Sequence, residues 1–245
     1  MPLFGSLDTG GIAGVPVMAD LHTDPLTIER ADSLHLLHEI ESAPMLDLIP
    51  PALHPTVPPT VSVWGWRCQG TEIGDFTVVQ VRIGCRAGVR PRGYLLACYV
   101  DDDAAADALS ARWGFRRDPG TPKLETMHHQ TVVTVEREGT TIIDAALESP
   151  ESISGGDVQY VAGMHLAETP SGPRLVQVDP EFTFHRADRG KPRLHVFDAA
   201  AVGDERIVPS WPVSSSFAIT DITLPALRYV CRVDVPAMAG TEPVR

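Results

Sequence analysis

The amino-acid sequence predicts an α+β fold that is mainly antiparallel β, with one principal helix. The chain has 245 residues, enough for one large domain or two small ones with a buried core. Its 20 Gly and 22 Pro indicate many turns between short elements. About ten β-branched or aromatic runs of strand length surround a single Ala-rich segment. We expect a barrel or cone, because closure removes the exposed edges of such a sheet.

The N-terminal part of the chain predicts little regular structure. Residues 1–30 are polar and Gly-rich without a sustained period, which is typical of an arm that becomes ordered only by docking. Residues 31–240 are then expected to form a single domain. Residues 44–59 are interpreted as a connector, because repeated prolines in their second half exclude a regular helix or a central strand.

The remaining sequence alternates strand-like runs with turns around one helical segment. A helix is predicted over residues 104–113, because three aspartates precede an Ala-rich stretch and Gly114 can end it. Two β-branched runs at residues 131–135 and 140–143 have the pattern of a β-hairpin. Further strands are predicted at residues 61–66, 76–83, 94–100, 158–167, 174–178, 182–185, 193–197, 217–224 and 229–235.

The charge balance argues against polyanionic partners. The chain has 32 acidic and 20 basic side chains, a formal charge of −12, so nucleic acid or an anionic membrane would be repelled at long range. Its four cysteines lack C-x-x-C spacing and are typical of reduced core thiols in a cytoplasmic protein. Neither a basic, apolar leader nor a long apolar run is present, so secretion and membrane insertion are not expected.

No metal or cofactor is predicted. His35 and His38 are three residues apart and His128 adjoins His129, but neither pair has a carboxylate and a third ligand at the spacing of a metal site. The sequence also lacks the Gly-rich phosphate loops and the Gly-x-Ser-x-Gly pattern of nucleotide-binding proteins and hydrolases. The expected partner is a small-molecule substrate.

Three stretches in order carry a family resemblance. They are residues 94–105, continuing to Trp113-Gly114-Phe115, then residues 190–197, and then the serine-rich residues 213–225. Together they resemble the acetoacetate decarboxylase family, over roughly residues 30 to 235. The resemblance implies an antiparallel β cone-barrel, a homo-oligomer of at least two copies, and a lyase that acts on a β-keto acid through a lysine Schiff base. Acetoacetate decarboxylase is itself the standard example of a lysine made nucleophilic by a lowered pKa.

The residues that would carry this chemistry differ here. The family has a Pro-Lys-Lys step after its helix, whereas residues 115–118 read Phe-Arg-Arg-Asp and place Arg117 at the nucleophile position. A guanidinium stays protonated and cannot form an iminium. The family's active-site glutamate falls on Val78 and its substrate-binding arginine on Ala31, beside Arg30. Decarboxylation by the standard route is therefore not predicted.

Two interpretations of the basic residues remain open. Arg117, which we expect to face the interior, could hold a substrate carboxylate or enolate, with Arg116 beside it; alternatively the two arginines are solvated or paired with Asp118. Lys123 is the one lysine nearby and would restore the Schiff base if six residues are inserted before Pro122. Alternatively Lys123 is a surface residue at the entry to a strand.

The predicted site contains these groups together with proton donors and cavity-lining residues. Arg117, Lys123, Glu125 and His128 are the candidate catalytic residues, and Tyr94 and Tyr99 are further proton donors. The candidate substrate-binding residues are Arg30, Phe76, Val78, Gln80, Cys98, Phe115 and Arg116.

The function predicted is an enzyme of specialised metabolism that acts on a keto acid or polyketide-like molecule as a hydratase, dehydratase, aldolase, isomerase or cyclase. The alternatives are a non-catalytic binding protein on the same fold and a decarboxylase that uses Lys123.

Overall fold

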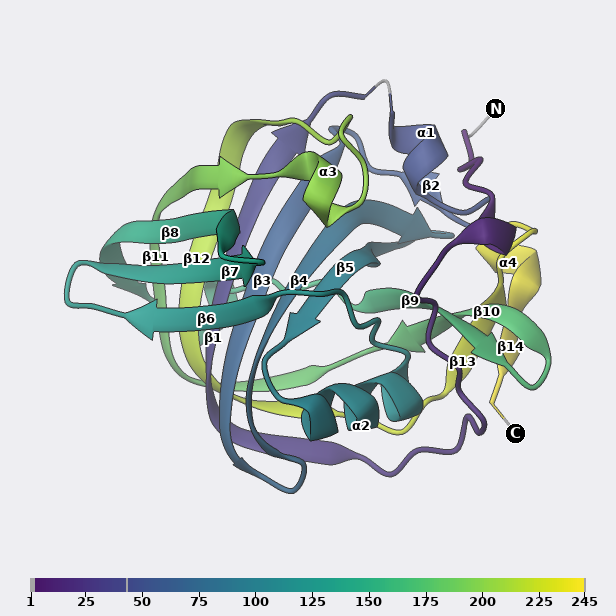
Figure 1. Ribbon diagram of the computed structural model, residues 1–245, viewed down its shortest axis with the longest axis horizontal. Helices are drawn as coiled ribbons and strands as arrows, with labels where there is room; N and C mark the ends of the chain where they lie inside the picture. The colour runs from purple at the N-terminus through teal and green to yellow at the C-terminus, as the bar shows by residue number, and fades with distance from the viewer. Residues whose placement is uncertain (1–2, 43, 245) are drawn as a thin grey trace.

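The computed structural model describes residues 3–42 and 44–244, and these form one strongly curled sheet with few helices (Figure 1). The strands are β1 (Leu26–Ile40), β2 (His54–Pro55), β3 (Thr60–Thr71), β4 (Gly74–Ala87), β5 (Arg90–Val100), β6 (Thr121–Thr126), β7 (Gln130–Arg137), β8 (Thr140–Ile153), β9 (Gly163–Thr169), β10 (Gly172–Val178), β11 (Glu181–Phe197), β12 (Pro209–Leu224), β13 (Tyr229–Arg232) and β14 (Thr241–Pro243). The helices are α1 (Met45–Leu48), α2 (Asp103–Trp113), α3 (Ala199–Val202) and α4 (Ala237–Gly240), with 3-10 turns η1 (Thr9–Gly11) and η2 (Gly155–Asp157). The predicted α+β, mainly antiparallel class is confirmed.

The strand order is β14-β13-β10-β9-β5-β4-β3-β1-β12-β11-β8-β7-β6, with β2 beside β4. Among the described strands only β5 and β9 pair in parallel. Hydrogen bonds in this part of the chain do not close the sheet into the expected barrel, because β14 and β6 end the order without pairing to each other. The curled sheet is held together by side-chain packing instead of by hydrogen bonds between its ends, because β6, β7 and β8 curl across β3, β4 and β5 (Figure 1).

One glycine shows how close this approach is. A Cβ on Gly65 in β3 would lie 3.1 Å from a methyl group of Val133 in β7 and 3.2 Å from one of Leu124 in β6. An apolar cluster lies between the two layers, with Val63, Val81 and further residues of β3–β8. The curl of the sheet is therefore stabilised by burial of apolar surface from strands far apart in the sequence.

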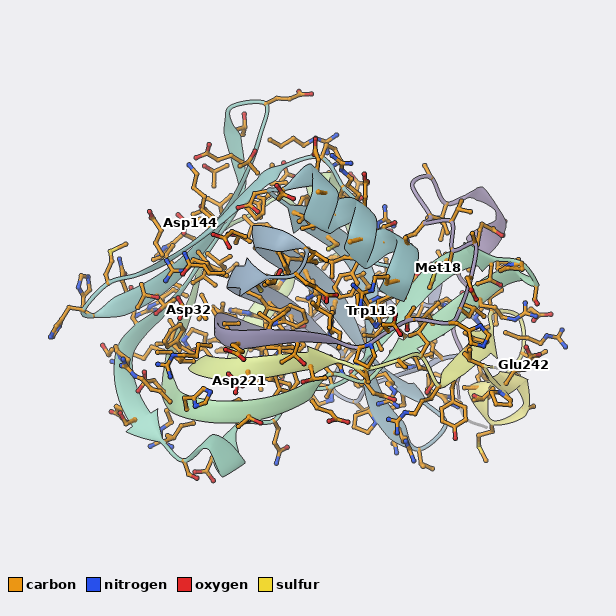
Figure 2. All side chains as sticks on the ribbon, turned by 90° about the horizontal axis from the view of Figure 1, so that it is seen from below. Met18, Asp32, Trp113, Asp144, Asp221 and Glu242 are labelled. Atoms are coloured by element: carbon orange, nitrogen blue, oxygen red, sulfur yellow. The ribbon has the colours of Figure 1, made fainter. Side chains whose placement is uncertain are left out.

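A second apolar cluster lies on the opposite face of β3–β5 and is covered by α2. The helix begins where the Asp102 carboxylate accepts from the Ala105 N–H at 2.8 Å, and it ends at Gly114 in the left-handed conformation (φ 65°). Trp113 and Met18 are buried on the inner side of α2 (Figure 2). The helix predicted over residues 104–113 is thereby confirmed.

The segments around the domain differ in part from the prediction. Strand β1 begins at Leu26, so the N-terminal arm is shorter than the expected 1–30, and its residues 1 and 2 lie outside the described residues. The arm docks through the Met18 N–H, which donates to the Glu168 carbonyl at 2.8 Å. The runs 182–185 and 193–197 belong to the single strand β11, while residues 158–162 precede β9 without regular structure.

The four cysteines are free and buried, as predicted. No helix in residues 3–42 and 44–244 is long and apolar enough to span a bilayer.

Gly114 provides a test of this packing. A Cβ at Gly114 would lie 3.2 Å from the Met18 Sδ and 3.3 Å from the Ala167 Cβ, whereas a Cβ at Gly139, also left-handed (φ 77°), meets nothing within 4 Å. Backbone strain alone should make Gly139→Ala cost about 1 kcal/mol, and added crowding should bring Gly114→Ala to about 2 to 4 kcal/mol. Urea unfolding of the two variants measures the difference. If both variants lost the same free energy of unfolding, α2 would not be tightly packed on the sheet.

Candidate functional site

Strand β4 carries a row of buried side chains that changes from apolar to polar along one face. Phe76 and Val78 pack in the apolar cluster beneath α2. Gln80 and Arg82 continue the row and are 0% and 1% exposed. Five residues predicted as substrate-binding are thus buried: Phe76, Val78, Gln80, Cys98 and Phe115.

The guanidinium of Arg82 is buried without a carboxylate partner among the described residues. Its Nε donates to Oε1 of Gln80 at 2.9 Å, its Nη2 donates to the same oxygen, and its Nη1 donates to the Val161 carbonyl at 3.2 Å. Burial lowers the pKa of Arg82 to about 10, so the group stays charged at neutral pH. A guanidinium has five N–H donors, and three are engaged here. The remaining two suit a planar anion.

Aromatic rings surround this charge. The Arg82 Cζ lies 4.7 Å from the centroid of Trp64, within the range of a cation–π interaction. The Trp64 ring is held by its Nε1, which donates to the Ser33 Oγ at 2.9 Å, and its aromatic neighbours include Tyr160 at 4.6 Å and His35 at 5.4 Å between ring centroids. Burial, with the charge of Arg82, lowers the pKa of His35 to about 3.

A second histidine presents an unpartnered nitrogen next to the guanidinium. The Nδ1 of His165 lies 2.9 Å from the Trp113 carbonyl, so Nδ1 carries the proton and Nε2 keeps its lone pair. That Nε2 is buried without a hydrogen-bond partner. The His165 Nε2 and the Arg82 Nη2 both lie within 3.4 Å of one point, where a Cβ on Gly163 would stand. Burial and, to a smaller extent, the charge of Arg82 together lower the pKa of His165 to about 3.

We call these residues the Arg82 cluster: Ser33, His35, Trp64, Gln80, Arg82, Tyr160 and His165. Besides the His165 nitrogen, the Nε2 of Gln80 is buried without a partner. The cluster therefore combines a fixed cation, a neutral imidazole with a bare lone pair and an amide donor. Such a set can bind a carboxylate or enolate and exchange a proton with it.

The two arginines after α2 are not part of this cluster. Arg117 is exposed and pairs with Asp103 and Asp107 of α2, which corrects the expectation that it faces the interior. Arg116 is the more buried of the two, and its Nε and Nη2 donate to the carboxylate of Asp118 at 2.8 and 2.7 Å. That carboxylate also accepts from the Cys98 N–H at 2.8 Å, so it fixes the segment along the edge of β5. Both arginines already have carboxylate partners.

The other candidate catalytic residues lie on the surface. Lys123 and Glu125 are exposed on β6, where the alternate residues Pro122 and Leu124 are buried, and His128 is exposed in the following turn. Arg30 is exposed at a bulge of β1, with its N–H held by the Asp221 carboxylate at 2.9 Å. The structure therefore does not bring these four residues to the buried row of β4. Tyr94 and Tyr99 are buried, and burial raises the pKa of both phenols.

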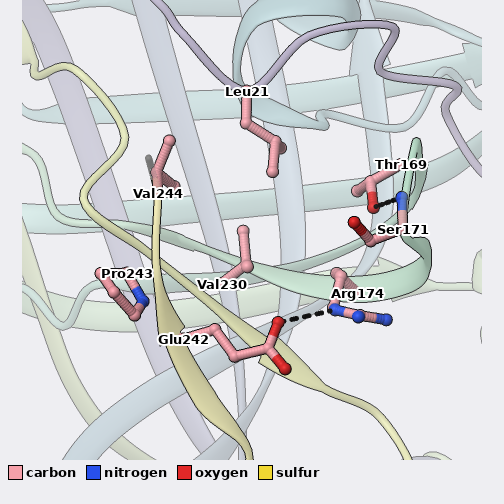
Figure 3. A pocket seen from close by; sticks show the side chains of 8 residues that line it. All are labelled: Leu21, Thr169, Ser171, Arg174, Val230, Glu242, Pro243 and Val244. Carbon is pink, nitrogen blue, oxygen red and sulfur yellow. Dashed lines mark hydrogen bonds and ion pairs between the residues drawn. The ribbon is translucent and has the colours of Figure 1, made fainter.

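A separate surface pocket lies near the C-terminal strands (Figure 3). It is lined by Leu21, Thr169 and Val230, with Arg174 and Glu242 bridged at 3.4 Å. None of the predicted site residues lines it. In the part of the chain that the structure describes, no group of three or more His, Cys, Asp or Glu side chains is placed to hold a metal ion.

Comparison with known proteins decides the family. The family model described as acetoacetate decarboxylase (ADC) matches residues 19–232. The chain belongs to the acetoacetate decarboxylase family. No curated protein matches it in sequence.

Solved structures of this family share the fold. An acetoacetate decarboxylase from Legionella pneumophila subsp. pneumophila is 18% identical, with a TM-score of 0.73 over 90% of this chain and 97% of that one. An acetoacetate decarboxylase-like enzyme from Sphingomonas wittichii RW1 is 15% identical, with a TM-score of 0.68 over 91% and 98%. The enduracididine biosynthesis enzyme MppR, complexed with pyruvate, is 15% identical, with a TM-score of 0.69 over 87% and 97%. At these identities the likeness concerns the fold.

Arg82 and His165 were not among the residues predicted from the sequence. A signal for Arg82 exists: Gln80 and Arg82 are two residues apart in a run that is otherwise apolar on both faces, and a buried polar side chain is more informative than a buried apolar one. His165 has no such signal, because its burial depends on the covering helix α2 and on Phe115, whose ring lies 4.5 Å away.

The buried histidines should make stability depend on pH. His165 stays neutral in the folded chain but takes up a proton near pH 6.5 when unfolded, so the free energy of unfolding falls as the pH drops from 6.5 toward 3. Between pH 6.5 and 5 the wild type should lose about 2 kcal/mol more than His165→Asn, which keeps a donor for the Trp113 carbonyl. Urea unfolding at several pH values measures this. His128→Asn, at an exposed position, is the control. If the unfolding free energy of His165→Asn depended on pH as steeply as that of the wild type, His165 would not be the neutral group in the folded chain.

Proposed function

We propose that the chain is an acetoacetate decarboxylase-like enzyme that acts on a small keto acid without a lysine Schiff base, with Arg82 holding the substrate's negative charge. The observation that carries the proposal is the buried guanidinium of Arg82, which has free donors and no carboxylate partner in the described residues. An uncompensated buried cation costs several kcal/mol in stability, and a bound anion would offset that cost. The pyruvate in the MppR complex is a ligand of this class.

His165 is the proton carrier of this proposal. Its bare Nε2 would take a proton from the carbon next to the substrate carbonyl, and the electron pair of that C–H bond would form an enolate whose oxygen faces Arg82. The low pKa of His165 is partly caused by the charge of Arg82. A bound carboxylate would offset that charge and raise the pKa, so the base would become effective when substrate is present.

Enolate chemistry of this kind serves isomerases, hydratases, dehydratases and aldolases, and we propose a reaction of this group. A non-catalytic binding protein would use the same Arg82 without proton transfer. Assembly as a homo-oligomer and a cytoplasmic location remain predictions.

Both lysines of the chain, Lys123 and Lys191, are exposed, and neither lies in the Arg82 cluster. Borohydride reduction in the presence of pyruvate should therefore leave the intact mass of the protein unchanged, since no lysine amine lies in the cluster to attack the carbonyl of a bound substrate. Mass spectrometry of the reduced protein measures this. A stable adduct mapped to Lys123 would restore the Schiff-base route.

Proton exchange tests the role of Arg82 directly. In D₂O the enzyme should exchange the C3 protons of 2-oxobutanoate, as followed by NMR, and Arg82→Met should lower that rate at least about 30-fold, because a desolvated charge contact worth about 2 kcal/mol or more is lost. His165→Asn should lower it as well. The melting temperature of Arg82→Met should not fall, because an apolar side chain replaces an uncompensated buried charge.

Arg112→Met is the matched control. Arg112 also stacks on an indole, with its Cζ 4.4 Å from the Trp113 ring centroid, but it pairs with Glu72 at 2.7 Å. Its exchange rate should stay near that of the wild type. If Arg117→Met lost proton exchange and Arg82→Met did not, Arg117 would be the residue that holds the negative charge of the substrate. Binding of 2-oxobutanoate without any exchange would favour the non-catalytic alternative.

A further inference from the structure

A surface pocket of about 280 Å³ lies beside the Arg82 cluster, at the end of the sheet where β5 begins and β10 ends. Its lining includes Arg90, Arg92, Tyr160, Val161, Asp179 and Phe182. Apolar and aromatic side chains thus form part of the wall, and two arginines form another part. The enzyme proposed above leaves this pocket without a role.

The pocket carries more positive charge than its carboxylate can neutralise. Nη2 of Arg92 lies 3.0 Å from Asp179, and Arg228 approaches the same carboxylate at 3.8 Å. No acidic side chain among the described residues pairs with Arg90, which is exposed. Two guanidinium groups therefore approach one carboxylate, and Arg90 lines the same pocket, in a chain whose formal charge is −12. Such a concentration of cations is suited to an anionic ligand.

Arg92 also has an unsatisfied donor. The side chain is 8% exposed, and its Nε is buried without a hydrogen-bond partner. Buried polar atoms of proteins are normally hydrogen-bonded, so an unpartnered donor on a residue that lines a pocket leaves that guanidinium able to take a further acceptor.

One thin wall separates this pocket from the Arg82 cluster. Tyr160 and Val161 line the pocket, and on the other side the Tyr160 ring lies against Trp64 while the Val161 carbonyl accepts from Arg82. The wall is residues 158–162, which have no regular structure, and the Ala162 carbonyl fastens them to the Gly93 N–H at 2.9 Å. Displacement of this short segment would join the pocket to Arg82.

We propose that the pocket holds a second carboxylate of the same substrate, so that the enzyme acts on a dianionic oxo acid. The 2-oxo acid end of the substrate, where the reaction occurs, lies at Arg82, and its remote carboxylate lies between Arg90 and Arg92. This inference rests on the proposed function, and it adds the class of substrate: an oxo-dicarboxylate in preference to a monocarboxylate of equal length.

Calorimetric titration with two probes of five carbons tests the proposal. The dianion 2-oxoglutarate should bind at least tenfold more tightly than the monoanion 2-oxopentanoate. Arg92→Met should abolish this preference without weakening the monoanion more than twofold. Arg90→Gln, a change at an exposed side chain, should reduce the preference even if Arg92→Met fails to fold.

Arg174→Met is the matched control, because Arg174 is a similarly buried arginine that lines another pocket and pairs with one carboxylate, Glu242. It should keep the wild-type preference. Equal binding of the two probes by the wild type, or an unchanged preference in both Arg90→Gln and Arg92→Met, would overturn the dianion proposal while leaving Arg82 in its role. Binding of the dianion that depends on Arg92 but not on Arg82 would instead support the pocket and overturn the proposed function. If neither probe binds, both the proposed function and the dianion proposal are contradicted.

Discussion

The charge of Arg82, held inside the sheet, constrains how the polar groups around it are arranged. An arginine taken out of water must be given partners, and here they are the Gln80 amide, the Val161 carbonyl and the face of Trp64. Each partner is itself fixed: Gln80 by its place in β4, Trp64 by its hydrogen bond to Ser33, and Val161 by the segment that closes over the cluster. Strands β1, β3 and β4 and residues 158–162 thus converge on a single guanidinium. The partners stabilise the charge without neutralising it.

A fixed guanidinium and a lysine nucleophile favour different reactions on the same fold. A lysine that forms an iminium makes an electron sink for loss of carbon dioxide, and it must be neutral to do so. A guanidinium stays charged and leaves the carbonyl of the substrate intact, so it stabilises an enolate instead. In the proposed function the buried cation Arg82 takes the part of the lysine, while Arg117, which the sequence resemblance placed at the lysine position, pairs with aspartates on the surface.

Local features were predictable from the sequence, and features set by tertiary contacts were not. The caps of α2 at Asp102 and Gly114, and the hairpin of β7 and β8, are encoded by neighbouring residues. The orientation of Arg117 could not be predicted, because it follows from the pairing of Asp118 with the Cys98 N–H on a distant strand. The alternation of apolar residues predicted a strand over residues 76–83, and in β4 the side chains of Phe76, Val78 and Gln80 form one buried row. Without the covering elements, the same alternation could not show that the next residue of the row, Arg82, is buried too.

The central claim is that Arg82, rather than any other basic residue, receives the substrate's anionic group. A crystal structure of the protein with bound 2-oxobutanoate tests it most directly, because the position of the carboxylate can be seen. We expect the carboxylate or the carbonyl oxygen to accept hydrogen bonds from the guanidinium of Arg82, with the His165 Nε2 beside the C3 carbon. A carboxylate bound at Arg116 or Arg117, with Arg82 still enclosed by Gln80, Trp64 and Val161 alone, would contradict it.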